Sequence, residues 1–144
     1  LFLAPNWRVS LLRSFKKSAI VKILMVGADS DSHSPALKVV DKSYVIPKFS
    51  ERNCVEKIKA ICDRENVDVI LPMTNKAIEF MDKNRVEFDE GDLLFYLADH
   101  TLIQTSNDKR KLAEFFTQHN FASPDLIDPN KSFFVDSSLI APQR

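Results

Sequence analysis

Glycine is scarce in this sequence, with two residues among 144, whereas proline occurs seven times and stiffens the expected loops. Backbone approaches a phosphate group closely only where side chains are absent, so glycine-rich loops build the usual phosphate cradles. The chain contains neither GxGxxG nor GxxxxGK[ST]. This absence disfavours a P-loop enzyme, and it weakens the interpretation of the chain as a small nicotinamide oxidoreductase.

Cysteine is equally rare, and its placement argues against several metal and redox classes. Cys54 and Cys62 are eight residues apart on an expected helix, with no CxxC pair. A disulfide framework or zinc site is therefore not expected, and both thiols are predicted to be ordinary buried or half-buried side chains. His100 is expected in a loop and His119 in a last helical turn. No Ser-His-Asp or Cys-His order is recognisable, so we predict no catalytic residue and no metal ligand.

The chain has no excess of charge and no long hydrophobic run. Twenty Lys and Arg residues balance twenty Asp and Glu residues. Without a positive excess, neither a nucleic acid nor an anionic membrane surface is the expected partner. The longest apolar run, AIVKILMVGA, contains Lys22 and is too short to span a bilayer, and the N-terminus lacks a leader pattern. We therefore expect a cytoplasmic protein.

Short apolar runs alternate with helical patterns along most of the chain. The runs lie at 1–4, 21–29, 43–47, 67–73 and 92–98, and the helical patterns at 7–18, 52–66, 75–88 and 106–120. Continuous Val, Ile and Leu between turn residues is typical of strands buried on both faces. We predict an α/β fold over residues 1–124, namely a Rossmann-like three-layer α/β/α domain with a mostly parallel sheet of about five strands.

Polar residues follow the predicted strands at the edge where parallel sheets bind ligands. Asn6 and Arg8 follow the first strand at the start of a helix, where N–H groups favour an anion. The alternative there is that Trp7 packs under the sheet edge. Thr74 follows the fourth strand, where it can contact a ligand or cap the next helix, and capping is favoured.

Asp29 and Asp31 lie beside His33 in the loop after the second strand. Two carboxylates are too few for a hard cation, and zinc would need further His or Cys ligands. A turn in which Asp29 accepts hydrogen bonds from local N–H groups is favoured over a contact with substrate, which stays the alternative.

The helix predicted over 106–120 carries an unusual charge. Ser106 or Asn107 is expected to cap it, and Asp108 suits the positive end of the helix dipole. Lys109 opposes that dipole at a cost of about 0.3–1 kcal/mol. A cation in this position indicates a functional requirement, and the alternative is an ordinary surface lysine.

Three stretches in this order resemble one family: LFLAPNWRVSLLRSFKK (1–17), VGADSDSHSPALKVVDKSYVIPK (26–48) and NDKRKLAEFFTQHNFASP (107–124). They are similar to the first strand and helix, the Asp-rich loop and third strand, and the Asn-Asp-Lys helix of the pre-ATP-grasp domain. This is the N-terminal domain of ATP-grasp ligases, here of the group similar to the carbamoyl-phosphate-synthase large subunit.

Two positions depart from the pattern of that group. Asn6 and Trp7 precede a single Arg8 where the group has glycine and paired arginines. Asn120 stands where the group has glycine after the helix, a mild change because Asn also accepts a left-handed conformation.

The resemblance implies an enzyme that uses ATP and Mg²⁺ in its full-length form. ATP would phosphorylate a carboxylate, and an amine or ammonia would displace phosphate from the acyl phosphate. Lys109 matches a basic position that reaches the ATP phosphates in several relatives. The candidate substrate contacts are the polar residues expected at the edge of the sheet where ligands bind, namely Asn6, Arg8, Asp29, Asp31 and Thr74.

The tail over residues 125–144 contains two further apolar stretches, SFFVD and SLIA. The resemblance implies that an ATP-grasp body follows, so we expect a linker and the truncated start of that body. Such a chain would be inactive alone and would hold no cofactor. Whether copies pair as a homodimer stays open. The alternative function is a non-catalytic α/β module that binds a ligand or another protein.

Overall fold

The computed structural model describes residues 1–18, 22–89 and 93–122. These residues form two compact units, Leu1–Ile103 and one that begins at Gln104, and each is described by itself. The strands are β1 (Phe2–Leu3), β2 (Val26–Asp29), β3 (Lys42–Val45), β4 (Val69–Pro72) and β5 (Leu94–Phe95). The helices are α1 (Val9–Lys17), the 3-10 helix η1 (Pro35–Lys38), α2 (Cys54–Glu65), α3 (Asn75–Lys83), α4 (Arg85–Phe88), α5 (His100–Asn107) and α6 (Lys109–Gln118). The expected boundary at residue 124 and the apolar stretches after it lie outside the described residues.

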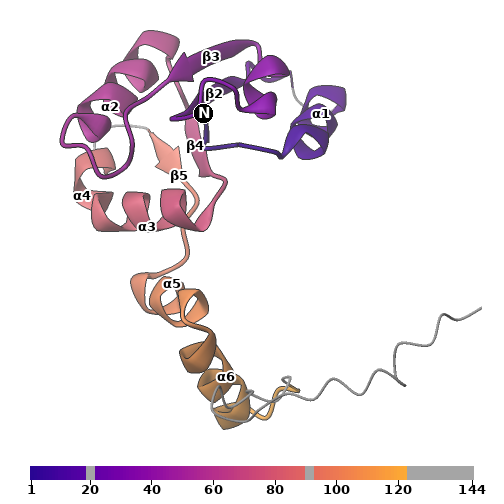
Figure 1. Ribbon diagram of the computed structural model, residues 1–144, viewed down its shortest axis with the longest axis vertical. Helices are drawn as coiled ribbons and strands as arrows, with labels where there is room; N and C mark the ends of the chain where they lie inside the picture. Colours follow the sequence, from indigo (N-terminus) through magenta and orange to yellow (C-terminus); the bar gives the residue numbers. More distant parts are fainter. Residues whose placement is uncertain (19–21, 90–92, 123–144) are drawn as a thin grey trace, which may run out of the picture. The chain divides into compact units, whose positions relative to one another are not determined.

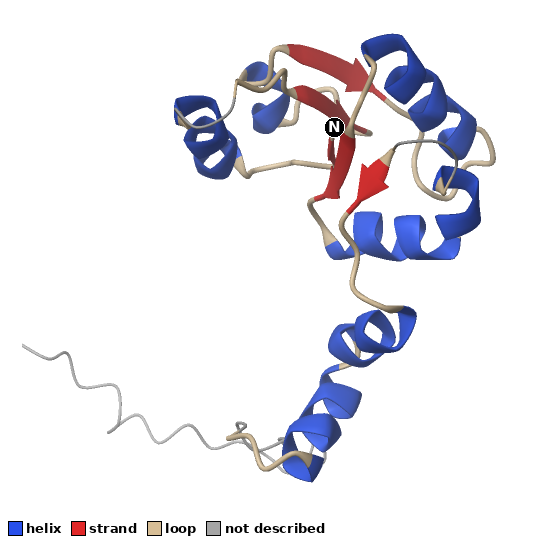
Figure 2. Ribbon diagram, turned by 180° about the vertical axis from the view of Figure 1, so that it is seen from behind, coloured by secondary structure: helices blue, strands red, loops and turns tan. Residues whose placement is uncertain are grey.

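The five strands form one sheet in the order β3-β2-β1-β4-β5 (Figure 2). Every neighbouring pair is parallel. The short central strand β1 pairs with both sides, because Phe2 is opposite Gly27 of β2 and opposite Leu71 of β4. The predicted α/β fold with a sheet of about five strands is confirmed, and the sheet is wholly parallel.

Helices cover both faces of this sheet (Figure 1). Successive side chains of a strand point to opposite faces, which divides the apolar residues of the unit into two clusters. Leu3 belongs to the larger cluster, together with Ile58 of α2. Phe2 belongs to the smaller cluster with Leu12 of α1, and its ring meets that of Phe15 edge-on at 5.3 Å between centroids. The three layers of the prediction are therefore present.

Two helical segments of the first unit differ from their predicted bounds. The helix predicted over 75–88 is divided at Asn84, which leaves helical geometry (φ −114°, ψ 26°). The side-chain amide of Asn84 donates to the Phe80 carbonyl at 2.7 Å and so satisfies a helix-end acceptor. His100, expected in a loop, instead begins α5. Asp99 caps this helix, since its carboxylate accepts the Leu102 N–H at 2.9 Å.

The second unit corrects the prediction for the start of α6. Asp108 is the cap, and its side chain accepts the N–H groups of the second and third helical residues. Ser106 and Asn107, the predicted caps, belong to α5. Asn120 follows α6 with φ 57°, so the left-handed conformation expected there is confirmed. None of the described helices is long and apolar enough to cross a membrane.

A buried carboxylate joins α2 to the edge strand β3. Glu65, the last residue of α2, accepts hydrogen bonds from the Lys42 ammonium and the Tyr44 hydroxyl. The hydrogen bond from Lys42 lowers the pKa of Glu65, and the bond from Tyr44 lowers it further. Burying a carboxylate without hydrogen-bond partners would cost folding free energy, and these two bonds offset that cost for Glu65.

A second buried carboxylate, that of Asp82, joins α3 to the first residues of α4 and α5. Asp82 of α3 accepts a hydrogen bond from Arg85 Nε at 2.7 Å, and its other oxygen lies 2.7 Å from His100 Nδ1. The bond from Arg85 is the main cause that lowers the pKa of Asp82. Arg85 also donates to the Ala98 carbonyl, so the group fixes the residues before α5.

Acid should destabilise the protein through these two carboxylates. A carboxyl whose pKa is lowered by folding stabilises the native state above its unfolded pKa, and this contribution is lost as the pH falls through the folded-state pKa. The ordinary values are 4.5 for Glu65 and 3.8 for Asp82. The urea midpoint should therefore fall between about pH 5 and about pH 2, and less steeply in Glu65→Gln. A midpoint that stays constant over this range would contradict the assignment.

Candidate functional site

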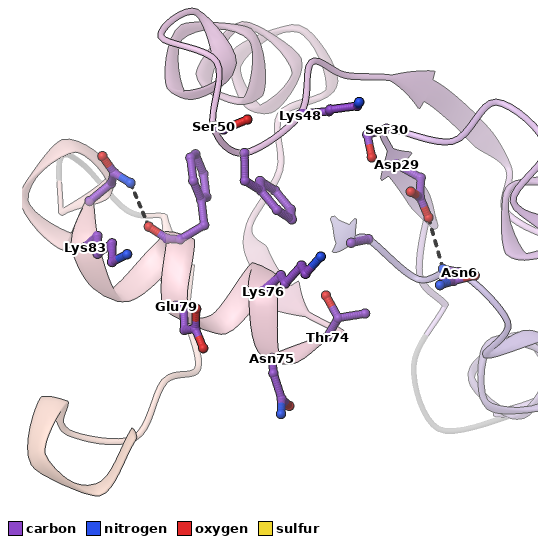
Figure 3. A pocket seen from close by; sticks show the side chains of 14 residues that line it. Asn6, Asp29, Ser30, Lys48, Ser50, Thr74, Asn75, Lys76, Glu79 and Lys83 are labelled. Atoms are coloured by element: carbon purple, nitrogen blue, oxygen red, sulfur yellow. Dashed lines mark hydrogen bonds between the residues drawn. The ribbon is translucent and has the colours of Figure 1, made fainter. Parts of the chain in front are cut away.

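A cavity of about 970 Å³ lies at the carboxyl edge of the sheet in the first unit. This size is within the range of small-molecule sites, roughly 300–1,000 Å³. The walls come from the loops after β1, β2, β3 and β4 and from α3 (Figure 3). The lining residues include Asn6, Asp29, Ser30, Lys48, Phe49, Thr74, Lys76, Glu79, Phe80 and Lys83. The structure thus brings together the loops after the first, second and fourth strands, where candidate residues were predicted, with the loop after the third.

The strand order explains why these loops meet. From β1 the chain crosses to β2 and β3 on one side of the sheet, and it then returns to β4 on the other side of β1. Crossovers that leave a central strand in opposite directions open a crevice at the carboxyl ends, and ligands of open α/β sheets bind there. Asn6 after β1 and Thr74 after β4 both line the cavity at that crevice.

Asp29 ties two of the loops together at the end of β2. Its side chain is buried, one oxygen accepts the Asn6 N–H at 3.1 Å, and the other accepts the Asp31 N–H at 3.2 Å. The bond from Asp31 confirms the favoured prediction of a turn built on a local N–H group, whereas the bond from Asn6, which is distant in sequence, was not predicted. A contact between Asp29 and substrate stays a prediction.

Asn6 holds the loop after β1 in an unusual conformation. Its φ of 46° is left-handed, which Asn tolerates better than most residues with a side chain. The Asn6 carbonyl accepts hydrogen bonds from the Ser34 hydroxyl at 3.2 Å and the Ala36 N–H at 3.0 Å. The backbone of this loop is thus anchored to both Asp29 and η1, while the Asn6 side chain is exposed beside the cavity.

Two of the candidate substrate contacts do not line the cavity. Arg8 donates from Nε to the Met73 carbonyl at 2.7 Å, which joins the loop after β1 to the end of β4. Asp31 is exposed and accepts the His33 N–H at 2.8 Å in its own turn. Trp7 is 77% exposed, so the alternative in which it packs under the sheet edge is wrong.

Thr74 is the cap of α3, as favoured from the sequence. Its hydroxyl oxygen accepts the Ala77 N–H at 3.2 Å. The same residue lines the cavity, so its capping bond fixes the side chain at the edge of the site. A contact with substrate stays a prediction for Thr74.

Three lysines around the cavity were not identified from the sequence. Lys48 lies in the loop after β3, and Lys76 and Lys83 lie in the first and last turns of α3. A signal for Lys76 was present, because a cation in the first turn of a helix opposes the helix dipole. Lys48 and Lys83 carry no comparable signal, since the loop and the last helical turn are both ordinary places for lysine.

Lys109, the predicted nucleotide contact, is in the second unit at the first position of α6. Its side chain is exposed. The first turn of α6 has no acidic residue after the Asp108 cap, so the cation there is not offset within the helix. Its contact with ATP stays a prediction.

The two cysteine thiols are buried and weakly reactive. Cys54 and Cys62 are buried, as predicted, and burial raises the pKa of each thiol to about 11. Thiols with such pKa values are almost entirely protonated at neutral pH and are poor nucleophiles. Within the described ranges, no group of three His, Cys, Asp or Glu side chains is arranged to hold a metal ion.

Comparisons with known proteins bear on this fold. A family model described as "PylC-like, N-terminal domain" matches residues 1–96. Comparison with curated protein sequences gives no match. Among solved structures, the crystal structure of a complete multifunctional pyruvate carboxylase from Rhizobium etli is similar, with a TM-score of 0.55 and 13% identity. The similarity covers 88% of this chain but 13% of that enzyme, and at this identity it shows the fold alone.

Removing the Asp29 carboxylate should destabilise the first unit. Asp29→Ala leaves two backbone N–H groups without their acceptor, and we expect the free energy of unfolding to fall by roughly 1–3 kcal/mol. Asp31→Ala, in the same loop but exposed, should cost about 0.5 kcal/mol or less. Urea denaturation of both variants measures the difference, and equal losses would contradict the anchoring role.

Proposed function

The chain belongs to the PylC-like N-terminal domain family, the pre-ATP-grasp domain of an ATP-grasp enzyme family, and from this premise we propose that it forms the substrate-side wall of an ATP-dependent ligase. The reaction would join a carboxylate to an amine or ammonia through an acyl phosphate. The observation that carries the proposal is the cavity at the carboxyl edge, where α/β sheets of this topology bind small molecules.

The acid substrate would lie in this cavity. Asn6, Asp29 and Thr74 lie at one end of it (Figure 3). The Asn6 amide and the Thr74 hydroxyl suit the carboxylate of a small acid, whereas the Asp29 carboxylate suits only a hydrogen-bond donor of that acid. The backbone anchoring of Asp29 and the capping bond of Thr74 hold two of the three side chains before any ligand arrives. Preorganised polar groups lower the entropic cost of binding.

The described residues do not by themselves fit a nucleotide with its Mg²⁺. Gly27, the glycine of β2, is packed inside the sheet, where an added Cβ would lie 3.0 Å from the Val40 side chain. It therefore serves close packing and not a phosphate cradle. With no metal-ligand group among these residues either, ATP and Mg²⁺ would be held mainly by an ATP-grasp body. Lys109 would contribute one cation toward the ATP phosphates.

The similarity to the carbamoyl-phosphate-synthase group supports ammonia or an amine as the second substrate. In such a reaction the acid oxygen attacks the γ-phosphorus of ATP, ADP leaves, and the nitrogen then displaces phosphate from the acyl phosphate. The first step brings two anions together, the carboxylate and the γ-phosphate of ATP, so cations around the acid lower the repulsion between them. In the second step the nucleophile is a neutral nitrogen, which loses a proton as phosphate leaves.

The proposed ligase activity predicts ADP formation that requires an acid. The full-length protein should release ADP from ATP and Mg²⁺ only when a suitable carboxylic acid is supplied with ammonia or an amine. A coupled assay over a panel of acids measures this release. Absence of ADP formation with every acid would contradict the ligase and favour the non-catalytic ligand-binding module.

Replacing Lys109 should weaken ATP binding without weakening the fold. In the full-length protein, Lys109→Ala should raise KM for ATP by roughly tenfold through loss of a charge-assisted contact. Its thermal midpoint should not fall, because the change removes a cation that opposes the α6 dipole. The matched control is Lys111→Ala in the same helical turn. An unchanged KM in Lys109→Ala, or equal changes in both variants, would eliminate the assignment.

A further inference from the structure

The cavity contains three lysines whose ammonium groups have no partner within the described residues. Lys48, Lys76 and Lys83 line it, and none of the three forms an ion pair or a side-chain hydrogen bond there. Elsewhere in the same unit lysines near carboxylates are paired, as Lys16 is with Asp41 at 2.7 Å and as Lys42 is with Glu65. Lys17, Lys38 and Lys57 are unpaired within the described residues as well, so what distinguishes Lys48, Lys76 and Lys83 is that all three line one cavity.

The acidic residues of the cavity do not neutralise these cations. Both oxygens of Asp29 accept backbone N–H groups of the surrounding loops. Glu79 is engaged in an interaction of its own. The cavity therefore presents three ammonium groups against two carboxylates, of which Asp29 is occupied at both oxygens, and an anionic ligand is the chemistry that fits this balance.

The lysines are spread along the cavity. In Figure 3, Lys48 and Lys76 lie on opposite sides of the space, and Lys83 lies toward the end away from Asp29. Lys76 and Lys83 are seven residues apart on α3, which corresponds to about 10 Å along the helix axis. The cations are therefore spread along the length of the cavity, and this arrangement suits two anionic groups.

An aromatic surface lies between the two cationic ends. Phe80 of α3 and Phe49 of the loop after β3 both line the cavity, and their rings stack with 4.7 Å between centroids. Phe80 shares the cavity face of α3 with Lys76 and Lys83, because positions four and seven residues after Lys76 lie on the same side of a helix. Phe80 is buried in the core, and Phe49, which is partly buried, covers it, so a short apolar stem would pack on the exposed part of the Phe49 ring.

From this arrangement we infer that the cavity binds an acid with two anionic groups joined by a short apolar stem. One anionic group lies between Lys48 and Lys76, the stem lies on the Phe49 ring, and the second anionic group meets Lys83. The inference rests on the proposed function in one respect, namely that this ligand is the acid substrate of the ligase.

Two linear acids of equal carbon number test the inference by calorimetry on the full-length protein. Adipate has two carboxylates and hexanoate has one. Adipate should bind about tenfold more tightly, the usual gain from one charge-assisted contact. Lys83→Gln should abolish this preference, whereas Lys76→Gln should weaken the binding of both acids. Lys57→Gln, on the exposed face of α2, is the matched control and should change neither.

Equal binding of the two acids, no binding of adipate, or the same loss in Lys57→Gln and Lys83→Gln would each overturn the inference. Thermal unfolding of every variant shows that the fold is retained. The ADP assay separates this outcome from that of the ligase. ADP formation with monocarboxylic acids and no preference for adipate leaves the ligase standing without the two-anion site. A preference for adipate that requires Lys83, without ADP formation from any acid, leaves the two-anion site without the ligase.

Discussion

The carboxylate of Asp29 is the contact on which the site depends. β1 contributes two residues to the centre of the sheet, so its pairing alone holds the following loop weakly. Asp29 compensates for this by accepting the N–H of Asn6 from that loop and the N–H of Asp31 from the next one. The crevice between β1 and β4 exists because the strand order reverses there. Its walls keep their shape because a buried side chain joins the loops.

Charge is used in two different ways within the first unit. The buried carboxylates of Glu65 and Asp82 are fully engaged with donors and hold helices to strands or to each other. The ammonium groups of Lys76 and Lys83, in contrast, are exposed at the cavity and have no partner among the described residues. The buried charges are satisfied internally, and three of the exposed lysines line the cavity, where a ligand of opposite sign would enter. The net charge of the whole chain is zero and by itself indicates no anionic partner. The local excess of cations at the cavity nevertheless supports an anionic substrate.

The sheet was predictable from the sequence because strands buried on both faces leave continuous apolar runs, and their alternation with helices permits few topologies. The candidate site was predictable only in part. Asp29 and Thr74 follow strand ends and have caps and turns as local signals, whereas Lys48 and Lys83 enter the cavity only through the packing of distant segments. Asn84 was read as helical because the apolar spacing continues through it, and its side-chain bond to the helix end has no signature in that spacing.

The claim that the carboxyl edge of the sheet receives the acid is tested most directly by amide NMR of the isotope-labelled full-length protein during titration with adipate. Binding in the cavity predicts chemical-shift changes at the amides of Asn6, Ser30 and Lys76, with little change at Lys42 and Val69, where β3 and β4 begin. Changes centred on the beginnings of the strands, or no changes in the first unit at concentrations that saturate the protein, would contradict it.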